Sequence, residues 1–392
     1  MTETFHVGGT AHDRPFKIQR FGHLGLTIPD IDSALAFWTD NLGLRHSDSL
    51  RFPDIPKEVG HFTSVGSDHH SLVFIDAMLE KDDPDFQKGM TVNQLSFQVG
   101  TLQEVADGHD YFERLGTGTW RYGRDFPGSN WANYTFDPDG FRVELFYGME
   151  QIGWDRRSKP AQLYTSPPDY EPRPPEVAEF SELIARESSD GDIEKGFRPV
   201  EEMPYDYVVG GVRLQRPFAV TRMGAVYIFA TDVDASVEFY TTHIGLELTE
   251  QVEWNGHTAS YLRCGTDHHV LAILPMELRK TLGMNPDSYL CTFGIEIGTY
   301  SQLRDAVSWL SKRGVTVRTD LPPELHPGIG YAAMVTDDSG HTALLYSGME
   351  QIGWDGKPRP AEQRPTLDDE WPDILGPEFA AYSTPGRLGP IG

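Results

Sequence analysis

Two distant stretches of the chain show the same change from a strand-like to a helix-like pattern of apolar positions. Residues Phe21–Leu44 and Met223–Leu246 each begin with a short β-type run, pass through a turn that contains aspartate, and continue as an amphipathic helix. In the first stretch the i, i+3, i+7 spacing is carried by Leu35, Trp38 and Leu42. Both stretches therefore predict a strand that leads directly into a helix.

The same order of elements continues through both halves of the chain. Three further segments recur: Gly66–Phe74 as Gly265–Ile273, Gln94–Gly116 as Thr292–Gly314, and the octapeptide GMEQIGWD of 148–155 again at 348–355. An identical octapeptide with a Met and a Trp does not recur by chance at matching places. We interpret the chain as a tandem duplication in which each half holds two units of strand, helix and further strands.

Domain limits follow from this duplication. We expect an N-terminal domain at 16–155, a proline-rich connector at 156–217, a C-terminal domain at 218–355 and a tail at 356–392. The connector contains SPPDYEPRPPEV, whose prolines interrupt regular structure. The predicted fold class is α+β.

Composition and charge restrict the possible partners. The 392 residues include 33 Lys and Arg against 59 Asp and Glu, a formal charge of −26 that repels phosphate backbones and anionic lipid headgroups. No apolar run approaches the ~20 residues that cross a bilayer. Two cysteines and an N-terminus without an apolar signal region favour the reducing cytoplasm. We therefore expect no nucleic-acid partner, no membrane partner and a cytoplasmic location.

The most specific motif is the run Tyr-x-x-Asp-Pro-x-Gly-x-x-x-Glu between Tyr134 and Glu144. Together with the opening GHLGLTI and the segment GSDHHSLVF, it resembles the type I extradiol ring-cleaving dioxygenases of the vicinal oxygen chelate superfamily, which also contains glyoxalases and bleomycin resistance proteins. The resemblance implies two tandem domains, each of two βαβββ units in a cupped mixed sheet. It also implies one divalent metal, Fe(II) by the resemblance, with Mn(II) and Zn(II) as alternatives.

Carried over onto this sequence, the metal ligands are His23, Gln94 and Glu144. Gln94 stands where the family has a second histidine, and an amide oxygen is a weaker ligand than imidazole. Glutamine nevertheless binds metal in glyoxalase-like relatives. The corresponding positions of the second half cannot complete a site, because they are Ala225, Thr292 and Leu344. Any metal is therefore expected in the N-terminal domain.

Four further residues are candidates for catalysis by the same resemblance. His70 or its neighbour His69 would move protons, with His70 preferred, and Tyr134 would hydrogen-bond the substrate oxygens. Asp125 occupies the position of another family histidine, which is a second departure. The histidine pair recurs as His268 and His269 in the half without ligands, so a structural role for the pair stays open.

The repeated octapeptide is independent of the metal, because it follows both Glu144 and Leu344. We expect a structural role, with Trp154 and Trp354 sealing an edge of each domain beside Met149 and Met349, or else a role in a subunit interface. We expect a homo-oligomer.

The functional hypothesis is an extradiol-type metalloenzyme for a small aromatic substrate. A metal-dependent lyase, isomerase or hydrolase that does not activate O₂ is the first alternative. A binding protein without catalysis is the second.

Overall fold

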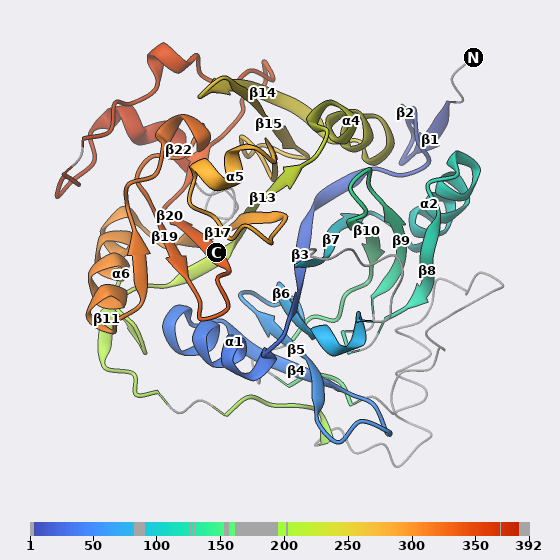
Figure 1. The fold of residues 1–392 in the computed structure, drawn as a ribbon, viewed down its shortest axis with the longest axis horizontal. Helices are drawn as coiled ribbons and strands as arrows, with labels where there is room; N and C mark the ends of the chain where they lie inside the picture. The colour runs from blue at the N-terminus through green and yellow to red at the C-terminus, as the bar shows by residue number, and fades with distance from the viewer. Residues whose placement is uncertain are drawn as a thin grey trace. The chain divides into compact units, whose positions relative to one another are not determined.

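A computed structural model describes residues 4–81, 91–125, 127–128, 130–152, 157–160, 195–200, 203–368 and 370–383 (Figure 1). The chain forms two compact units. The first comprises Met1–Leu35, Arg45–Glu201 and His243–Gly245, and the second comprises Ala36–Leu44, Glu202–Thr242 and Leu246–Gly392. Each unit is built around one eight-stranded mixed sheet, so the predicted α+β duplication is confirmed.

The first sheet has the strand order β4-β5-β6-β3-β7-β10-β9-β8. Strand β3 runs parallel to β6 and antiparallel to β7, and β7 runs parallel to β10. Its strands are β3 (Ile18–Ile28), β4 (Arg45–Arg51), β5 (Glu58–Ser64), β6 (Leu72–Asp76), β7 (Val92–Val99), β8 (Thr119–Arg124), β9 (Trp131–Phe136) and β10 (Arg142–Tyr147). The accompanying elements are the hairpin of β1 (Phe5–Val7) and β2 (Thr10–His12), helix α1 (Ile31–Phe37), the π-helical turn η1 (Trp38–Leu42), the short 3₁₀ helix η2 (Ala77–Leu79) and helix α2 (Leu102–Leu115).

The second sheet repeats this topology in the order β14-β15-β16-β13-β17-β20-β19-β18. Its strands are β13 (Val220–Ala230), β14 (Glu247–Trp254), β15 (His257–Arg263), β16 (Leu271–Pro275), β17 (Leu290–Ile297), β18 (Thr316–Arg318), β19 (Ala332–Thr336) and β20 (Thr342–Tyr346). Helices α4 (Val233–Glu238), η5 (Phe239–Ile244), α5 (Leu278–Thr281), α6 (Tyr300–Lys312) and η6 (Pro323–Leu325) accompany it. Smaller elements are β11 (Tyr207–Val209), β12 (Val212–Leu214), β21 (Met349–Glu350), η7 (Ala361–Gln363), η8 (Pro377–Ala381) and β22 (Tyr382–Ser383).

The long helices form for local reasons that the sequence already contains. The Thr101 hydroxyl accepts a hydrogen bond from the Glu104 N–H at the start of α2, and Gly116 closes the helix in the left-handed conformation at φ 74°. One face of α2 packs into the core through the buried side chains of Leu102, Val105 and Phe112. In the second unit, Thr299 caps α6 in the same way.

The concave faces of the two sheets are filled differently. In the second unit the interior is a packed apolar cluster that includes Tyr227, Tyr261, Met334, Leu344 and Tyr346. The first unit contains a cavity of about 360 Å³ lined by His23, Gln94 and Tyr134, whereas the cavities of the second unit, of about 410 and 450 Å³, are lined mainly by β14, residues 319–332 and the C-terminal segment 361–382. The duplication therefore preserved the fold, while the interior diverged.

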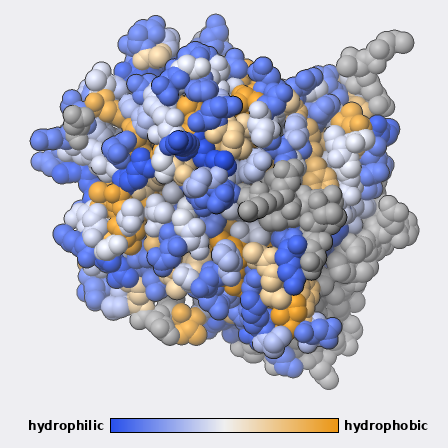
Figure 2. All heavy atoms as spheres, in the orientation of Figure 1, coloured by the Kyte–Doolittle hydropathy of each residue, from blue (hydrophilic) through white to orange (hydrophobic). Residues whose placement is uncertain are grey.

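The surface agrees with the acidic composition. Figure 2 shows a face dominated by hydrophilic residues, with apolar residues in small separate groups. Among the described residues, no helix combines the length and apolar character needed to span a bilayer.

The matching helix caps allow a stability prediction. Thr101→Ala and Thr299→Ala each remove a side-chain acceptor for an N–H of the first helical turn, so each should lower the free energy of unfolding by about 1 kcal/mol. Urea unfolding followed by circular dichroism measures both changes. Serine at either position retains the hydroxyl acceptor and serves as the control, and an alanine variant as stable as its serine counterpart would contradict the assignment.

Candidate functional site

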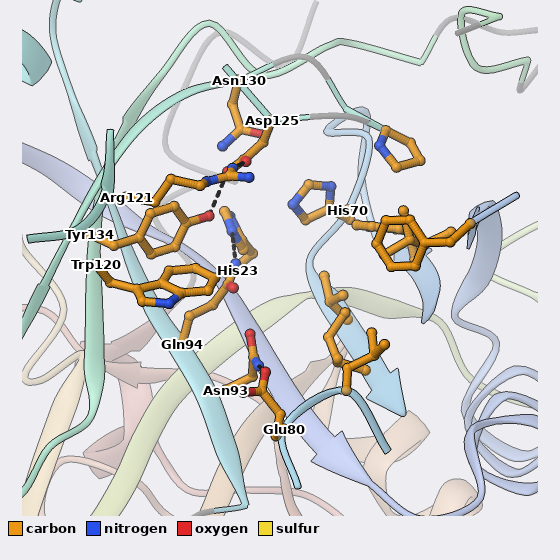
Figure 3. A pocket seen from close by; sticks show the side chains of 17 residues that line it. His23, His70, Glu80, Asn93, Gln94, Trp120, Arg121, Asp125, Asn130 and Tyr134 are labelled. Atoms are coloured by element: carbon orange, nitrogen blue, oxygen red, sulfur yellow. Dashed lines mark hydrogen bonds and ion pairs between the residues drawn. The ribbon is translucent and has the colours of Figure 1, made fainter. Parts of the chain in front are cut away.

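The cavity of the first unit has a polar wall and an apolar wall (Figure 3). The polar wall comes mainly from β8, β9 and the loop between them, with Trp120, Arg121, Asp125, Asn130 and Tyr134. The apolar wall is formed by Leu50, Phe52, Phe62, Val73, Ile75 and Leu79. Such a cavity accommodates a small, largely apolar molecule with a few fixed polar contacts.

His23, Gln94 and Glu144 converge beside this cavity. His23 Nε2 lies 2.8 Å from Glu144 Oε2, and the Gln94 Nε2 lies 3.0 Å from His23 Nε2 and 3.2 Å from Glu144 Oε2. Strand register explains the convergence. Ser96 on β7 pairs with His23 on β3 and with Glu144 on β10, and Gln94 is two residues from Ser96 on the same face of its strand.

The spacing of His23 Nε2, Glu144 Oε2 and the end of the Gln94 amide fits a divalent ion once the amide oxygen takes the place of Nε2. Neighbouring ligands of an octahedral ion at about 2.1 Å lie about 3.0 Å apart, which is close to the three observed separations. Rotation of the Gln94 amide would turn Oε1 toward the same point. Within the described part of the chain, no three His, Cys, Asp or Glu side chains form a metal-binding cluster. A metal bound by His23 and Glu144 would therefore take the Gln94 amide as its third ligand.

Two polar side chains that the sequence analysis missed hold the Glu144 carboxylate. Ser96 Oγ donates to Oε2 at 2.5 Å, and Asn130 Nδ2 donates to Oε1 at 2.8 Å. Groups of this kind orient a metal-binding carboxylate. The alternation of β7 could have identified Ser96, because it shares a face with Gln94. Asn130 lies in a loop and carries no such signal.

His70 lines the cavity, and its ring centre is 4.4 Å from that of His23. His69 lies outside the lining; its Nδ1 is 3.0 Å from His70 Nδ1, and its Nε2 is 3.5 Å from Asp48 Oδ2. Burial, followed by the nearby His23 and His69, lowers the pKa of His70 well below its usual 6.5. His70 is therefore neutral at pH 7. In its Nδ1 hydrogen bond with His69, one ring donates a proton and the other accepts it through a lone pair.

The octapeptide fixes the segment that carries both histidines. Its Glu150 carbonyl accepts from the His69 N–H at 2.9 Å, its Glu150 N–H donates to the Gly128 carbonyl at 2.9 Å, and Gln151 Nε2 donates to Asp68 Oδ1 at 2.7 Å. The second unit repeats these bonds. The Glu350 carbonyl accepts from the His268 N–H, the Glu350 N–H donates to the Gly328 carbonyl, and Gln351 Nε2 donates to Asp267 Oδ1. The octapeptide thus joins the histidine segment to the loop before β9 or β19.

The expected sealing role of the octapeptide tryptophans is wrong for Trp354, whose side chain is fully exposed. The polar bonds around Glu350 and Gln351 hold the segment without it. Met149 and Met349 are buried as expected. Trp154 lies outside the described residues.

Tyr134 and Asp125 form a hydrogen-bonded pair on the polar wall. The Tyr134 hydroxyl donates to Asp125 Oδ2 at 2.5 Å, and Arg121, another residue that sequence reasoning missed, forms an ion pair with the same carboxylate. Burial, followed by the negative charge of Glu144, raises the pKa of Tyr134 well above 10. The phenol therefore keeps its proton and directs it to Asp125.

The counterpart of His70 has a packing role in the second unit. His269 Nε2 lies 2.7 Å from the hydroxyl of Tyr227, a residue that stands where the first unit has Gly25. A buried ring thus contacts the counterpart of His70, whereas in the first unit the Gln94 side chain lies against Gly25.

Comparison with known proteins agrees with this architecture. The model of the Glyoxalase/Bleomycin resistance protein/Dioxygenase superfamily matches residues 20–145 and 222–345. Metapyrocatechase 2 of Cupriavidus necator is 32% identical over 137 residues, which are 34% of this chain and 38% of that protein. Biphenyl-2,3-diol 1,2-dioxygenase of Metapseudomonas furukawaii is 29% identical over 143 residues, 36% of this chain and 42% of that protein. The chain thus matches about two fifths of the length of each relative.

Two solved structures share the fold over most of the chain. The 2,3-dioxygenase LapB from Pseudomonas sp. KL28 has a TM-score of 0.57 at 14% identity and covers 88% of this chain and 96% of its own. The Mn(II)-bound glyoxalase from Novosphingobium aromaticivorans has a TM-score of 0.55 at 13% identity, with 87% and 85% covered.

The buried histidines predict sensitivity to acid. Burial also lowers the pKa of His269, so both His70 and His269 take up a proton more readily in the unfolded chain than in the folded protein. The free energy of unfolding should therefore fall as pH drops below about 6.5, by at most about 1.4 kcal/mol per pH unit for each group. In metal-free protein, His269→Gln should show a shallower loss between pH 6.5 and 5 in urea titrations. An unchanged slope would contradict the prediction.

Proposed function

Because the chain belongs to the Glyoxalase/Bleomycin resistance protein/Dioxygenase superfamily, we propose that its first unit is the active site of a metal-dependent ring-cleaving dioxygenase for a small catechol-like substrate. The observation that carries this proposal is the meeting of His23, Gln94 and Glu144 beside a cavity of about 360 Å³. The names of the two relatives, a metapyrocatechase and a biphenyl-diol dioxygenase, support the substrate class.

The three converging side chains would hold the metal, with Fe(II) as the proposed ion and Mn(II) or Zn(II) as alternatives. When bound, such an ion supplies the Lewis acidity that attracts two vicinal oxygens and, for Fe(II), the redox chemistry of O₂. Ser96 and Asn130 keep the Glu144 carboxylate in place, so little reorganisation is needed when the metal binds.

The other residues would orient the substrate and move protons. The lowered pKa of His70 leaves its imidazole unprotonated at pH 7, so the ring accepts a proton from a substrate hydroxyl, as a weaker base than free imidazole. The proton of Tyr134 is directed to Asp125, so the phenol oxygen is left to accept a hydrogen bond from the substrate. The apolar wall packs against the ring and limits access of water.

A second function is favoured by one specific feature, the amide in place of a second imidazole. A metal that acts only as a Lewis acid needs no redox chemistry, and this suits a lyase, isomerase or hydrolase of the same superfamily. The two functions differ in their need for O₂. Substrate turnover under strict exclusion of oxygen would replace the dioxygenase proposal with this one.

The cytoplasmic location is part of the proposal. It is supported by Cys264 and Cys291, which are not joined in a disulfide.

Glu144→Gln should remove the negative charge from the metal site while preserving its shape. We expect at least about a 100-fold loss of Fe(II) affinity, since changes in outer-shell partners alone cost about 10- to 100-fold. Loss of O₂ uptake with a catechol panel should accompany it. Metal analysis and chelator competition measure the first effect, and an oxygen electrode measures the second.

The matched control is Glu296→Gln, because Glu296 is an equally buried carboxylate on β17 of the second sheet. It should retain metal and activity. Wild-type protein that binds no divalent metal, or a Glu144→Gln variant with unchanged metal content, would refute the assigned site.

Gln94→His should strengthen Fe(II) binding about tenfold, because imidazole is a better ligand for this ion than an amide oxygen. Thr292→His places the same change at the corresponding position of β17, where Leu344 replaces the carboxylate ligand, and should leave metal binding unchanged. Isothermal titration with Fe(II) under anaerobic conditions compares the two. An equal effect of both variants would show that residue 94 does not bind the metal.

A further inference from the structure

The amide of Asn93 faces the cavity at the end opposite Asn130 and Asp125. In Figure 3 its oxygen points toward the interior, with Gln94 and His23 between it and the other end. Asn93 is only 5% exposed and lines the cavity. An acceptor on the cavity wall can bind a ligand that offers a donor at this place.

A β-bulge brings Asn93 to the cavity. Neighbouring residues of a regular strand point to opposite faces, so Asn93 and Gln94 would not both line one cavity. Here β3 pairs Gly25 with Gln94 but Leu26 with Val92, which leaves Asn93 as the extra residue. Such bulges redirect side chains next to functional sites.

The orientation of the Asn93 amide is fixed by its partners. Nδ2 donates to Glu80 Oε1 at 2.8 Å and to Thr27 Oγ1 at 3.2 Å. Arg142 donates to both oxygens of Glu80 at 2.9 Å, so both of these oxygens act as acceptors. Both amide protons are therefore used, and Oδ1 is the atom left for the cavity. Within the described residues Oδ1 has no hydrogen-bond partner.

The second unit shows that the fold does not require this arrangement. It has the same bulge, since Tyr227 pairs with Thr292 and Ile228 with Leu290, but the extra residue is Cys291, which is buried in the apolar core. Arg279 and Thr342 occupy the positions of Glu80 and Arg142. The bulge thus belongs to the architecture, and the Asn93–Glu80–Arg142 arrangement belongs to the unit with the metal-ligand set.

We propose that Asn93 determines substrate specificity by accepting a hydrogen bond from a neutral donor, a hydroxyl or N–H group, on the part of the aromatic ring that points away from the metal. The inference rests on the proposed function of this site. A ring carboxylate at the same place is disfavoured, because it would face the Asn93 oxygen, whose amide N–H groups are already used, in a wall that also contains the apolar side chains of Leu79 and Ile75.

Ligand pairs that differ only in the donor test this assignment. Anaerobic titrations of the Fe(II)-loaded protein compare 3- and 4-(hydroxymethyl)catechol with the 3- and 4-ethyl isosteres and with 3,4-dihydroxybenzoate. For one ring position, the wild-type protein should bind the hydroxymethyl ligand about tenfold more tightly than the ethyl ligand, as expected for one buried hydrogen bond. The benzoate should bind more weakly than either.

Asn93→Leu and Asn93→Cys should abolish this preference while retaining binding of the ethyl ligands; the cysteine is the residue that the second unit carries at its own bulge. Cys291→Ala, at that second bulge, is the matched control and should keep the wild-type preference. Wild-type protein that binds and cleaves catechols without preferring the donor, or Asn93 variants that keep the preference, would overturn this inference alone. Wild-type protein that binds none of the catechols would overturn the proposed function as well.

Discussion

The buried carboxylate of Glu144 is the group around which the first unit is organised. Its side chain has no exposed surface and lies in the middle of an eight-stranded sheet, where an uncompensated charge is costly. His23, Ser96, Gln94 and Asn130 all direct polar atoms to its two oxygens. The strand register supplies most of these contacts, so the stability of the sheet and the shape of the candidate metal site depend on the same residues.

The sister sheet shows what happens when this carboxylate is absent. Leu344 takes its place, Gly294 and Met334 replace its strand neighbours Ser96 and Tyr134, and the interior closes around an apolar cluster. A polar row in one sheet and an apolar row in the other are both compatible with the same topology. In the first interior both oxygens of Glu144 accept hydrogen bonds from polar neighbours, whereas His23 Nδ1 and Asn130 Oδ1 are buried without a hydrogen-bond partner among the described residues.

Features shared by both units and features confined to one have different physical roles. The octapeptide bonds to the histidine segment, the histidine pair and the strand bulge occur in both units, and they fix the framework. Glu144, Asn93 and the Glu80–Arg142 pair occur only in the first unit. Comparison of the two units therefore distinguishes residues that maintain the fold from residues that line the candidate site.

Much of this protein follows from sequence alone. The alternating and helical periodicities and the repeated segments predicted two copies of the same strand and helix order, because apolar periodicity is a local property that sets which face of each element is buried. The family resemblance implied the mixed sheet that each copy forms. The family motif identified His23, Gln94 and Glu144 as candidate metal ligands. Their counterparts in the second half, Ala225, Thr292 and Leu344, cannot form such a site, so the candidate site was assigned to the N-terminal half.

Other features depended on contacts between residues far apart in the chain. Strand register places Ser96 beside Glu144, and a loop brings Asn130 to the same carboxylate. Arg121 pairs with Asp125, and a bulge turns Asn93 into the cavity. Pairing between strands is a non-local interaction that periodicity does not encode. The sequence determined which residues could carry chemistry, and the tertiary structure decided which of them meet.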